Sequence, residues 1–146
     1  MQTQHSPAYR EDFYQWTKYT VTLLREGRLN ELDIPNIAEE IESMGNAQKH
    51  ALISHLAVLL MHFLKWKYQP DKRKNLWKTT IIVQRDEVID LLEDSPSFKH
   101  ELEEKFNRAY QRARKIAANE TGLALSVFPV ESPFIFEETM TEDWLP

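Results

Sequence analysis

The chain has 146 residues, no cysteine, only three glycines and a formal net charge of −5. Disulfides and thiolate metal sites are therefore excluded, and a cytoplasmic location is expected. The scarcity of glycine favours a single helical domain over residues 1–146 rather than a turn-rich β fold. No membrane association is expected, because the most apolar run, residues 56–64, is too short to span a bilayer.

Charge is unevenly distributed along the chain. Residues 1–115 contain 18 basic and 17 acidic residues, which gives +1, whereas residues 116–146 contain six acids and no lysine or arginine. The last part of the chain is thus an acidic segment attached to a nearly neutral body.

The first predicted helix covers residues 7–26. Ser6 and Pro7 suit its cap and first turn, and Gly27 suits its end. Apolar side chains and one threonine recur at steps of three and four, which predicts that they share the inward face. These residues are Tyr9, Phe13, Trp16, Thr20, Leu23 and Leu24.

A second helix is predicted over residues 34–67, starting after Asp33 as its cap. We expect a bend near residue 45, because Gly45 and Asn46 interrupt the pattern. Ile37, Ile41 and Met44 share one face before that point. Residues 56–64 are apolar nearly all round, which is typical of a central helix covered on several sides.

Two further helices are predicted over residues 76–93 and 96–121, the latter restarting at Ser95-Pro96. The inward residues of the last helix are Phe98, Leu102, Phe106, Ala109, Ala113 and Ala117. Residues 123–146 lose the helical period but keep several phenylalanines, which predicts an extended arm packed on the helices. The fold class is therefore all-α, an antiparallel bundle of four to five helices with a C-terminal arm.

His62 and Lys65 are the first candidate functional residues, because they interrupt the most apolar helix. His55 and His62 lie two turns apart, about 10 Å along the helix axis, which is too far to bind one metal ion. We expect His62 to be buried, neutral and bonded to an arginine or an acid of a neighbouring helix. The Lys65 stem can pack while its amine reaches water or a carboxylate.

Glu39, Glu40 and Glu42 form the run EEIE, the only candidate metal-ligand set. The run resembles part of the E-E-x-x-E motif of MazG-type nucleotide pyrophosphohydrolases, which implies a Mg²⁺ site. Ser43 stands where that motif needs its third acid, although Glu87 and Asp90 match the later E-x-x-D. We favour a solvated acidic first turn, and we expect no cofactor unless the chain is a hydrolase.

Arg85 falls on the apolar stripe of the third predicted helix, beside Trp77, Ile81, Val88 and Leu92. A guanidinium in such a stripe needs a partner, and Glu39 or Glu42 is the expected one. His62, Lys65, Arg85 and these acids would then form one polar cluster, which either fixes the helix register or carries out catalysis. The sequence favours the structural role.

Residues 65–78 combine six basic side chains, one acid and three aromatic rings. The candidate binding residues are Lys65, Lys67, Lys72, Arg73, Lys74, Trp77 and Lys78. Such a mixture can contact phosphates and stack bases, but the acidic overall charge does not favour nucleic acid. The acidic segment 116–146 is the preferred partner of these cations.

An ordered set of motifs covers nearly the whole chain: DFYQW, LDIPNIAEEIESMG, HLAVLLMHFLKWKYQP, WKTTIIVQRDEVI, DSPSFK, AYQRARKIAANETGL and FPVESPF. This set resembles the bacterial family catalogued as domain of unknown function 29. The resemblance implies an all-helical fold and no known activity. The family motifs fall on Glu39, Glu40, Glu42, His62, Lys65, Trp77, Arg85, Ser95, Pro96 and Tyr110.

Three functions follow as hypotheses. The first is a cytoplasmic, non-enzymatic interaction or assembly protein that binds a protein partner or forms homo-oligomers. The second is a metal-dependent hydrolase or nuclease in which His62 acts as acid or base and Lys65 and Arg85 bind phosphate. The third is an RNA-binding module that uses residues 65–78.

Overall fold

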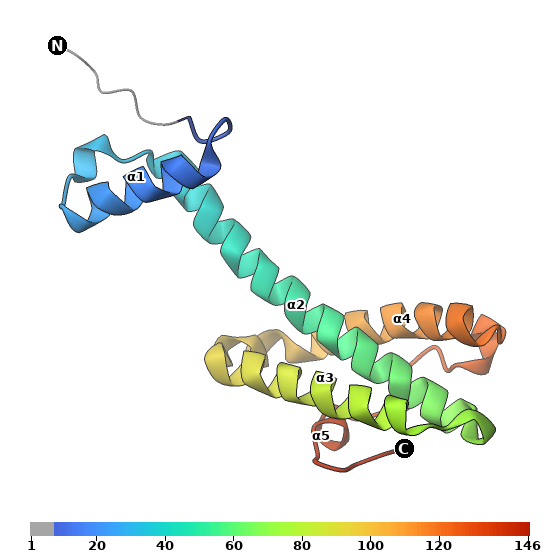
Figure 1. Cartoon of the computed structure of the whole chain (residues 1–146). Helices are drawn as coiled ribbons and strands as arrows, with labels where there is room; N and C mark the ends of the chain where they lie inside the picture. The colour runs from blue at the N-terminus through green and yellow to red at the C-terminus, as the bar shows by residue number, and fades with distance from the viewer. Residues whose placement is uncertain (1–7) are drawn as a thin grey trace. The chain divides into compact units, whose positions relative to one another are not determined.

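The computed structural model describes residues 8–146 of the chain (Figure 1). Contacts divide the chain into two compact units, Met1–Ala47 (unit 1) and Gln48–Pro146 (unit 2). The described residues form α-helices and short 3-10 helices and no strand, which confirms the all-α prediction. Within these residues, no helix is both long and apolar enough to cross a membrane.

Unit 1 contains α1 (Phe13–Arg25), the 3-10 helix η1 (Leu29–Glu31) and the first turns of α2 (Ile34–Tyr68). α1 begins later than predicted because Asp12 is its cap, and the Asp12 carboxylate accepts a hydrogen bond from the Gln15 backbone N–H at 3.1 Å. The predicted start signals, Ser6 and Pro7, lie outside the described residues.

The buried face of α1 is narrow. Trp16, Thr20 and Leu23 are buried, and the Tyr9 ring meets the Trp16 ring edge-on at 4.7 Å between centroids. Phe13 and Leu24, predicted to point inward, are exposed. Six other large apolar side chains of unit 1 are exposed as well, which are Tyr14, Val21, Leu29, Ile34, Ile41 and Met44.

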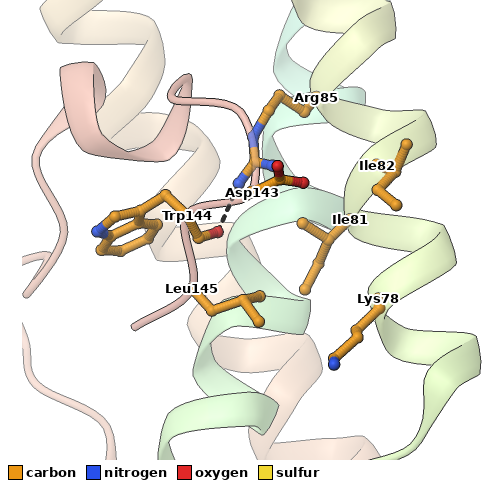
Figure 2. Close-up of a pocket in the computed structure, with 7 residues that line it drawn as sticks. All are labelled: Lys78, Ile81, Ile82, Arg85, Asp143, Trp144 and Leu145. Atoms are coloured by element: carbon orange, nitrogen blue, oxygen red, sulfur yellow. Dashed lines mark hydrogen bonds between the residues drawn. The ribbon is translucent and has the colours of Figure 1, made fainter.

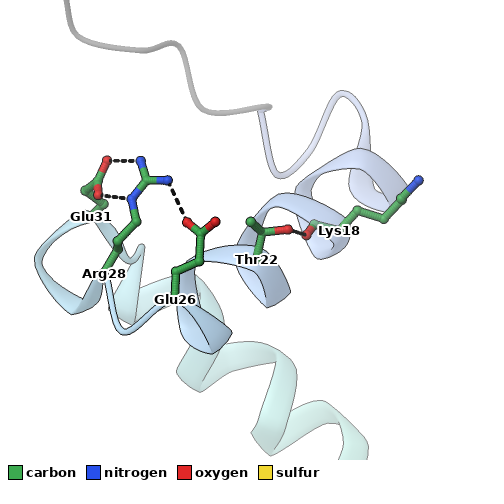
Figure 3. A network of polar contacts seen from close by, with 5 residues as sticks. All are labelled: Lys18, Thr22, Glu26, Arg28 and Glu31. Carbon is green, nitrogen blue, oxygen red and sulfur yellow. Dashed lines mark hydrogen bonds and ion pairs between the residues drawn. The ribbon is translucent and has the colours of Figure 1, made fainter.

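A polar network closes the turn that follows α1 (Figure 3). The Arg28 guanidinium donates to both carboxylate oxygens of Glu31, at 2.6 and 2.7 Å, and to Glu26 at 3.0 Å. Gly27, at φ +71°, supplies the left-handed turn predicted for it. The arginine lowers the pKa of the Glu31 carboxyl, chiefly by donating hydrogen bonds to it.

α2 remains helical through Gly45 and Asn46, where the sequence predicted an interruption or bend. One glycine costs a helix interior about 1 kcal/mol, which is little beside the packing of a helix of 35 residues. The later half of α2 is the centre of unit 2, as predicted. Its buried residues are Leu52, Ile53, Leu56, Ala57, Leu59, Leu60, Met61, Phe63, Leu64 and Trp66.

In unit 2, α3 (Asn75–Asp94) and α4 (Leu102–Thr121) share one hydrophobic core with this part of α2 (Figure 1). Each buries one stripe, and both stripes agree with the predicted periodicity. The buried residues are Trp77, Ile81, Arg85, Val88 and Leu92 on α3, and Lys105, Phe106, Ala109, Tyr110, Ala113 and Ala117 on α4. Phe98 and Leu102 are partly buried against the same core.

The connection between α3 and α4 differs from the prediction. Residues Pro96–Glu101 form the 3-10 helix η3, and α4 starts only at Leu102. Ser95 makes no side-chain cap bond; instead its backbone N–H donates to the Leu91 carbonyl at 3.0 Å. Ser95 therefore ends α3 rather than starting the next α-helix. At the other end of α4, Gly122 has φ +73° and is the predicted C-cap.

The C-terminal arm, residues 123–146, packs on unit 2 as expected and includes two short helices, η4 (Leu125–Val127) and α5 (Phe136–Thr139). Phe128 and Phe134 are buried in the core. Side chains of α4 hold the arm by its backbone carbonyls. Tyr110 donates to Pro129 (2.5 Å), Gln111 to Val130 (2.7 Å), and Arg114 to Phe128 (2.9 Å) and Leu125 (3.2 Å).

Candidate functional site

His62 is bonded within its own helix, so the predicted partner from a neighbouring helix is wrong. Its Nδ1 lies 2.8 Å from the Val58 carbonyl oxygen. Because a carbonyl oxygen can only accept, Nδ1 carries the proton and Nε2 is the free acceptor. Burial, and secondarily the Lys65 charge, lower the pKa of His62 below 6.5, so the ring is neutral at pH 7.

Lys65 lies one turn further along α2 and makes two contacts. Its Nζ is 3.0 Å from a carboxylate oxygen of Glu120, near the end of α4, and 4.8 Å from the centroid of the Trp77 ring. The amine thus meets both a carboxylate and an aromatic face. Glu120 belongs to the acidic segment 116–146, so this ion pair is one contact of the predicted kind between that segment and the cations.

Arg85 is buried, with 4% of its surface exposed, as its place on the apolar stripe predicted. Its partners are not Glu39 or Glu42. Nε donates to the Thr139 carbonyl and Nη2 to the Trp144 carbonyl, both at 2.8 Å. Burial lowers the pKa of the guanidinium, and the negative charges of Asp143, Asp86 and Glu142 oppose that shift.

Arg85 also lines two adjacent pockets between α3 and the C-terminal arm. The first, of about 230 Å³, is shown in Figure 2 with the Arg85–Trp144 hydrogen bond. Its lining residues are Lys78, Ile81, Ile82, Arg85, Asp143, Trp144 and Leu145. The second, of about 340 Å³, adds Asp86, Ile89, Met140 and Glu142. Neither is lined by His62 or Lys65, so the three candidate catalytic residues do not share a pocket here.

The run EEIE lies in the part of α2 that belongs to unit 1. Glu39 and Glu42 are exposed, and Glu40 accepts a hydrogen bond from the Tyr9 hydroxyl. That bond raises the pKa of Tyr9 to about 12. Among residues 8–146, no group of three or more histidines and acids is arranged to hold a metal ion.

Residues 65–78, called the basic corner below, place four of their six cations over two tryptophan rings. Arg73 lies 4.7 Å and Lys78 5.4 Å from the centroid of the Trp66 ring. Lys65 lies 4.8 Å and Lys74 5.6 Å from the centroid of the Trp77 ring. The two rings are only 8% and 5% exposed, because the cations and the core cover them. The predicted binding cations are therefore brought together, but the rings are closed to base stacking.

The start of α3 adds to the positive potential of the basic corner. Its N-cap is Lys74, which makes no side-chain cap bond, and its first turn contains no acid. The positive end of the helix dipole therefore lies among cations. Lys67, Lys72, Arg73, Lys74 and Lys78 are all exposed.

Two features were not predicted from the sequence. The first is the set of hydrogen bonds from Tyr110, Gln111 and Arg114 to the arm, since none of these residues was on the predicted inward face of the last helix. The second is the exposed apolar surface of unit 1. The heptad spacing of Ile34, Ile37, Ile41 and Met44 was visible in the sequence, but it did not reveal that unit 1 leaves most of this face uncovered.

Comparison with known proteins gives one family. The family model described as Domain of unknown function DUF29 matches residues 8–145, which is nearly the whole chain. No curated protein and no solved structure matches the chain.

Proposed function

The chain belongs to the DUF29 family, whose function is unknown, and we propose that it is a non-enzymatic interaction or assembly protein of the bacterial cytoplasm. The proposed partner is a second copy of the chain, contacted through the exposed apolar side chains of unit 1. The bacterial origin rests on the family resemblance, and the cytoplasmic location on the lack of cysteine.

The observation that carries the proposal is the imbalance between core and surface in unit 1. Its buried residues are Trp16, Thr20 and Leu23, whereas eight large apolar side chains are between 41% and 71% exposed. A unit of this size with so small a core needs stabilisation from outside itself. An exposed apolar surface of this extent is typical of interaction sites.

The spacing of the exposed residues on α2 supports a helix as the partner. Ile34, Ile41 and Met44 are exposed and Ile37 is half-buried, and the four follow steps of three and four, the a and d positions of a heptad. Such a seam packs its side chains into the holes of a facing helix.

Size-exclusion chromatography with light scattering, at tens of micromolar protein, tests the proposal. The wild-type chain should elute as a dimer or larger, and the double variant Ile41→Glu, Met44→Glu should be monomeric. The matched control is Val130→Glu with Ile135→Glu, two apolar side chains of the C-terminal arm that are equally exposed. This control should keep the wild-type mass. A wild-type chain that is monomeric throughout this range would refute the proposal.

A further inference from the structure

We infer that the surface which receives unit 1 is the basic corner of a second copy, together with the exposed face of α3 that continues from it. This inference rests on the proposed function and adds the identity of the receiving surface. The contact is heterologous, because the two copies contribute different surfaces.

Charge complementarity is the first argument. Residues 8–47 of unit 1 contain eight acids and four basic residues, a net charge of −4. The basic corner contains six basic residues and one acid, a net charge of +5. Opposite potentials of this size steer two surfaces together and select the correct pairing.

The arrangement of apolar and charged side chains is the second argument. On α2 of unit 1, Ile34, Ile41 and Met44 are exposed along one face, and Glu39 and Glu42 are exposed on other sides of the same helix. On α3, Leu76 is 65% exposed and Val83, two turns later on the same face, is 49% exposed. Lys72, Arg73 and Lys74 precede Leu76 in the chain, whereas the exposed acids Asp86 and Glu87 follow Val83. Each surface therefore combines exposed apolar side chains with a net charge, negative on unit 1 and positive on the basic corner.

The cations of the basic corner are positioned in advance, which is the third argument. Arg73 and Lys78 lie over Trp66, and Lys74 lies over Trp77. Arg73 also donates from Nε to the Trp66 carbonyl at 2.9 Å. Side chains held in this way lose less conformational entropy when they meet a carboxylate.

The same features favour an acidic protein helix over RNA. Both tryptophan rings are covered and cannot stack on bases. Leu76 and Val83 match an apolar ridge, whereas a phosphate backbone would leave them uncovered. The acidic character of the rest of the chain would also repel a long polyanion.

A charge-exchange experiment on the full chain tests the inference. One variant carries Glu39→Lys and Glu42→Lys, and the other carries Lys72→Glu and Lys74→Glu. Each variant alone should self-associate at least tenfold more weakly than wild type in sedimentation velocity. An equimolar mixture should associate again, because the unaltered acidic unit 1 of the second variant can then meet the unaltered basic corner of the first.

The control variant is Lys99→Glu with Lys115→Glu, which reverses two exposed lysines of unit 2 outside the basic corner and should associate like wild type. Circular dichroism checks that all variants fold. If both reversed variants associate like wild type while Ile41→Glu, Met44→Glu is monomeric, the receiving surface is a different one, and the proposed function survives. A mixture that stays dissociated also overturns the inference.

Two further outcomes are decisive. A monomeric wild-type chain would overturn the proposed function itself, and the inference with it. The other outcome concerns a labelled 20-nucleotide RNA. If this RNA binds wild type in a salt-sensitive manner and does not bind the Lys72→Glu, Lys74→Glu variant, and if neither charge reversal changes self-association, the basic corner is assigned to nucleic acid instead.

Discussion

Arg85 stays charged although its side chain is almost fully buried, because two backbone carbonyls of the C-terminal arm accept its hydrogen bonds. His62 and Tyr110 follow the same principle, bonding to the carbonyls of Val58 and Pro129. The burial of Arg85 could be predicted from its place on the apolar stripe. Its partners could not, because every residue carries a carbonyl and no sequence pattern marks which one is used.

Replacing Arg85 with methionine should lower the free energy of unfolding by about 2–4 kcal/mol, because two buried carbonyls lose their donors while the apolar stem is kept. Chemical denaturation measures the loss. The control is Arg108→Met, an exposed arginine of α4, which should change stability by less than about 0.5 kcal/mol. Equal effects of the two substitutions would contradict the role assigned to the Thr139 and Trp144 carbonyls.

His62 should make stability depend on pH below about 6.5. Its pKa is lower in the folded chain than in the unfolded one, so the unfolded state takes up the proton first as pH falls. The contribution of neutral His62 is complete above pH 6.5 and is lost progressively below it, down to the folded-state pKa. Denaturation midpoints between pH 5 and 8 should therefore fall less steeply with decreasing pH in His62→Gln than in wild type. Identical pH profiles would rule this out.

At the scale of the elements, helix ranges and the buried stripes of unit 2 could be predicted well, and the inward face of α1 and the helix ends less well. The stripes of α3 and α4 have the expected period, since burial on one side requires it. The end signals were ambiguous, because Gly45 and Ser95-Pro96 are compatible with more than one local structure. Ser95 completes α3, and Gly45 lies inside a continuous helix.

Gly45 and Gly122 should respond in opposite ways to alanine. At Gly45 an added Cβ meets no atom within 4 Å and the backbone is helical, so Gly45→Ala should stabilise by about 0.5–1 kcal/mol. Gly122 has φ +73°, a conformation that costs a residue with a side chain about 1–2 kcal/mol, so Gly122→Ala should destabilise. Thermal melts of the two variants measure both effects. If Gly45→Ala destabilised the chain instead, the assignment of Gly45 to the interior of a continuous helix α2 would be contradicted.

For the molecule as a whole, the C-terminal arm completes the core of unit 2. Phe134 packs edge-on against Phe63 and Trp144, with centroids 5.6 and 6.1 Å apart. The cluster of phenylalanines in the sequence was enough to predict a packed arm. The route of that arm depends on hydrogen bonds from Arg85, Tyr110 and Arg114, which join residues far apart in the chain and leave no local pattern.

Phe134 and its neighbour Ile135 offer a matched test of this role. Phe134→Ala should lower the free energy of unfolding by about 3–4 kcal/mol, because it empties a buried site shared by α2 and the arm. Ile135→Ala removes an exposed side chain and should cost well under 1 kcal/mol. Urea denaturation of both variants gives the comparison, and similar losses would mean that the arm is not part of the core.

The hydrogen bonds from side chains of α3 and α4 to the arm have a consequence for mutational tolerance. Tyr110, Gln111, Arg114 and Arg85 all donate to backbone carbonyls, which every amino acid supplies. The donors on the helices are therefore intolerant of change, while most arm positions between the aromatic anchors are free to vary. A saturation library scored for folding should show this asymmetry as low tolerance at four helix positions and three aromatic anchors (Phe128, Phe134 and Trp144), and broad tolerance elsewhere along the arm.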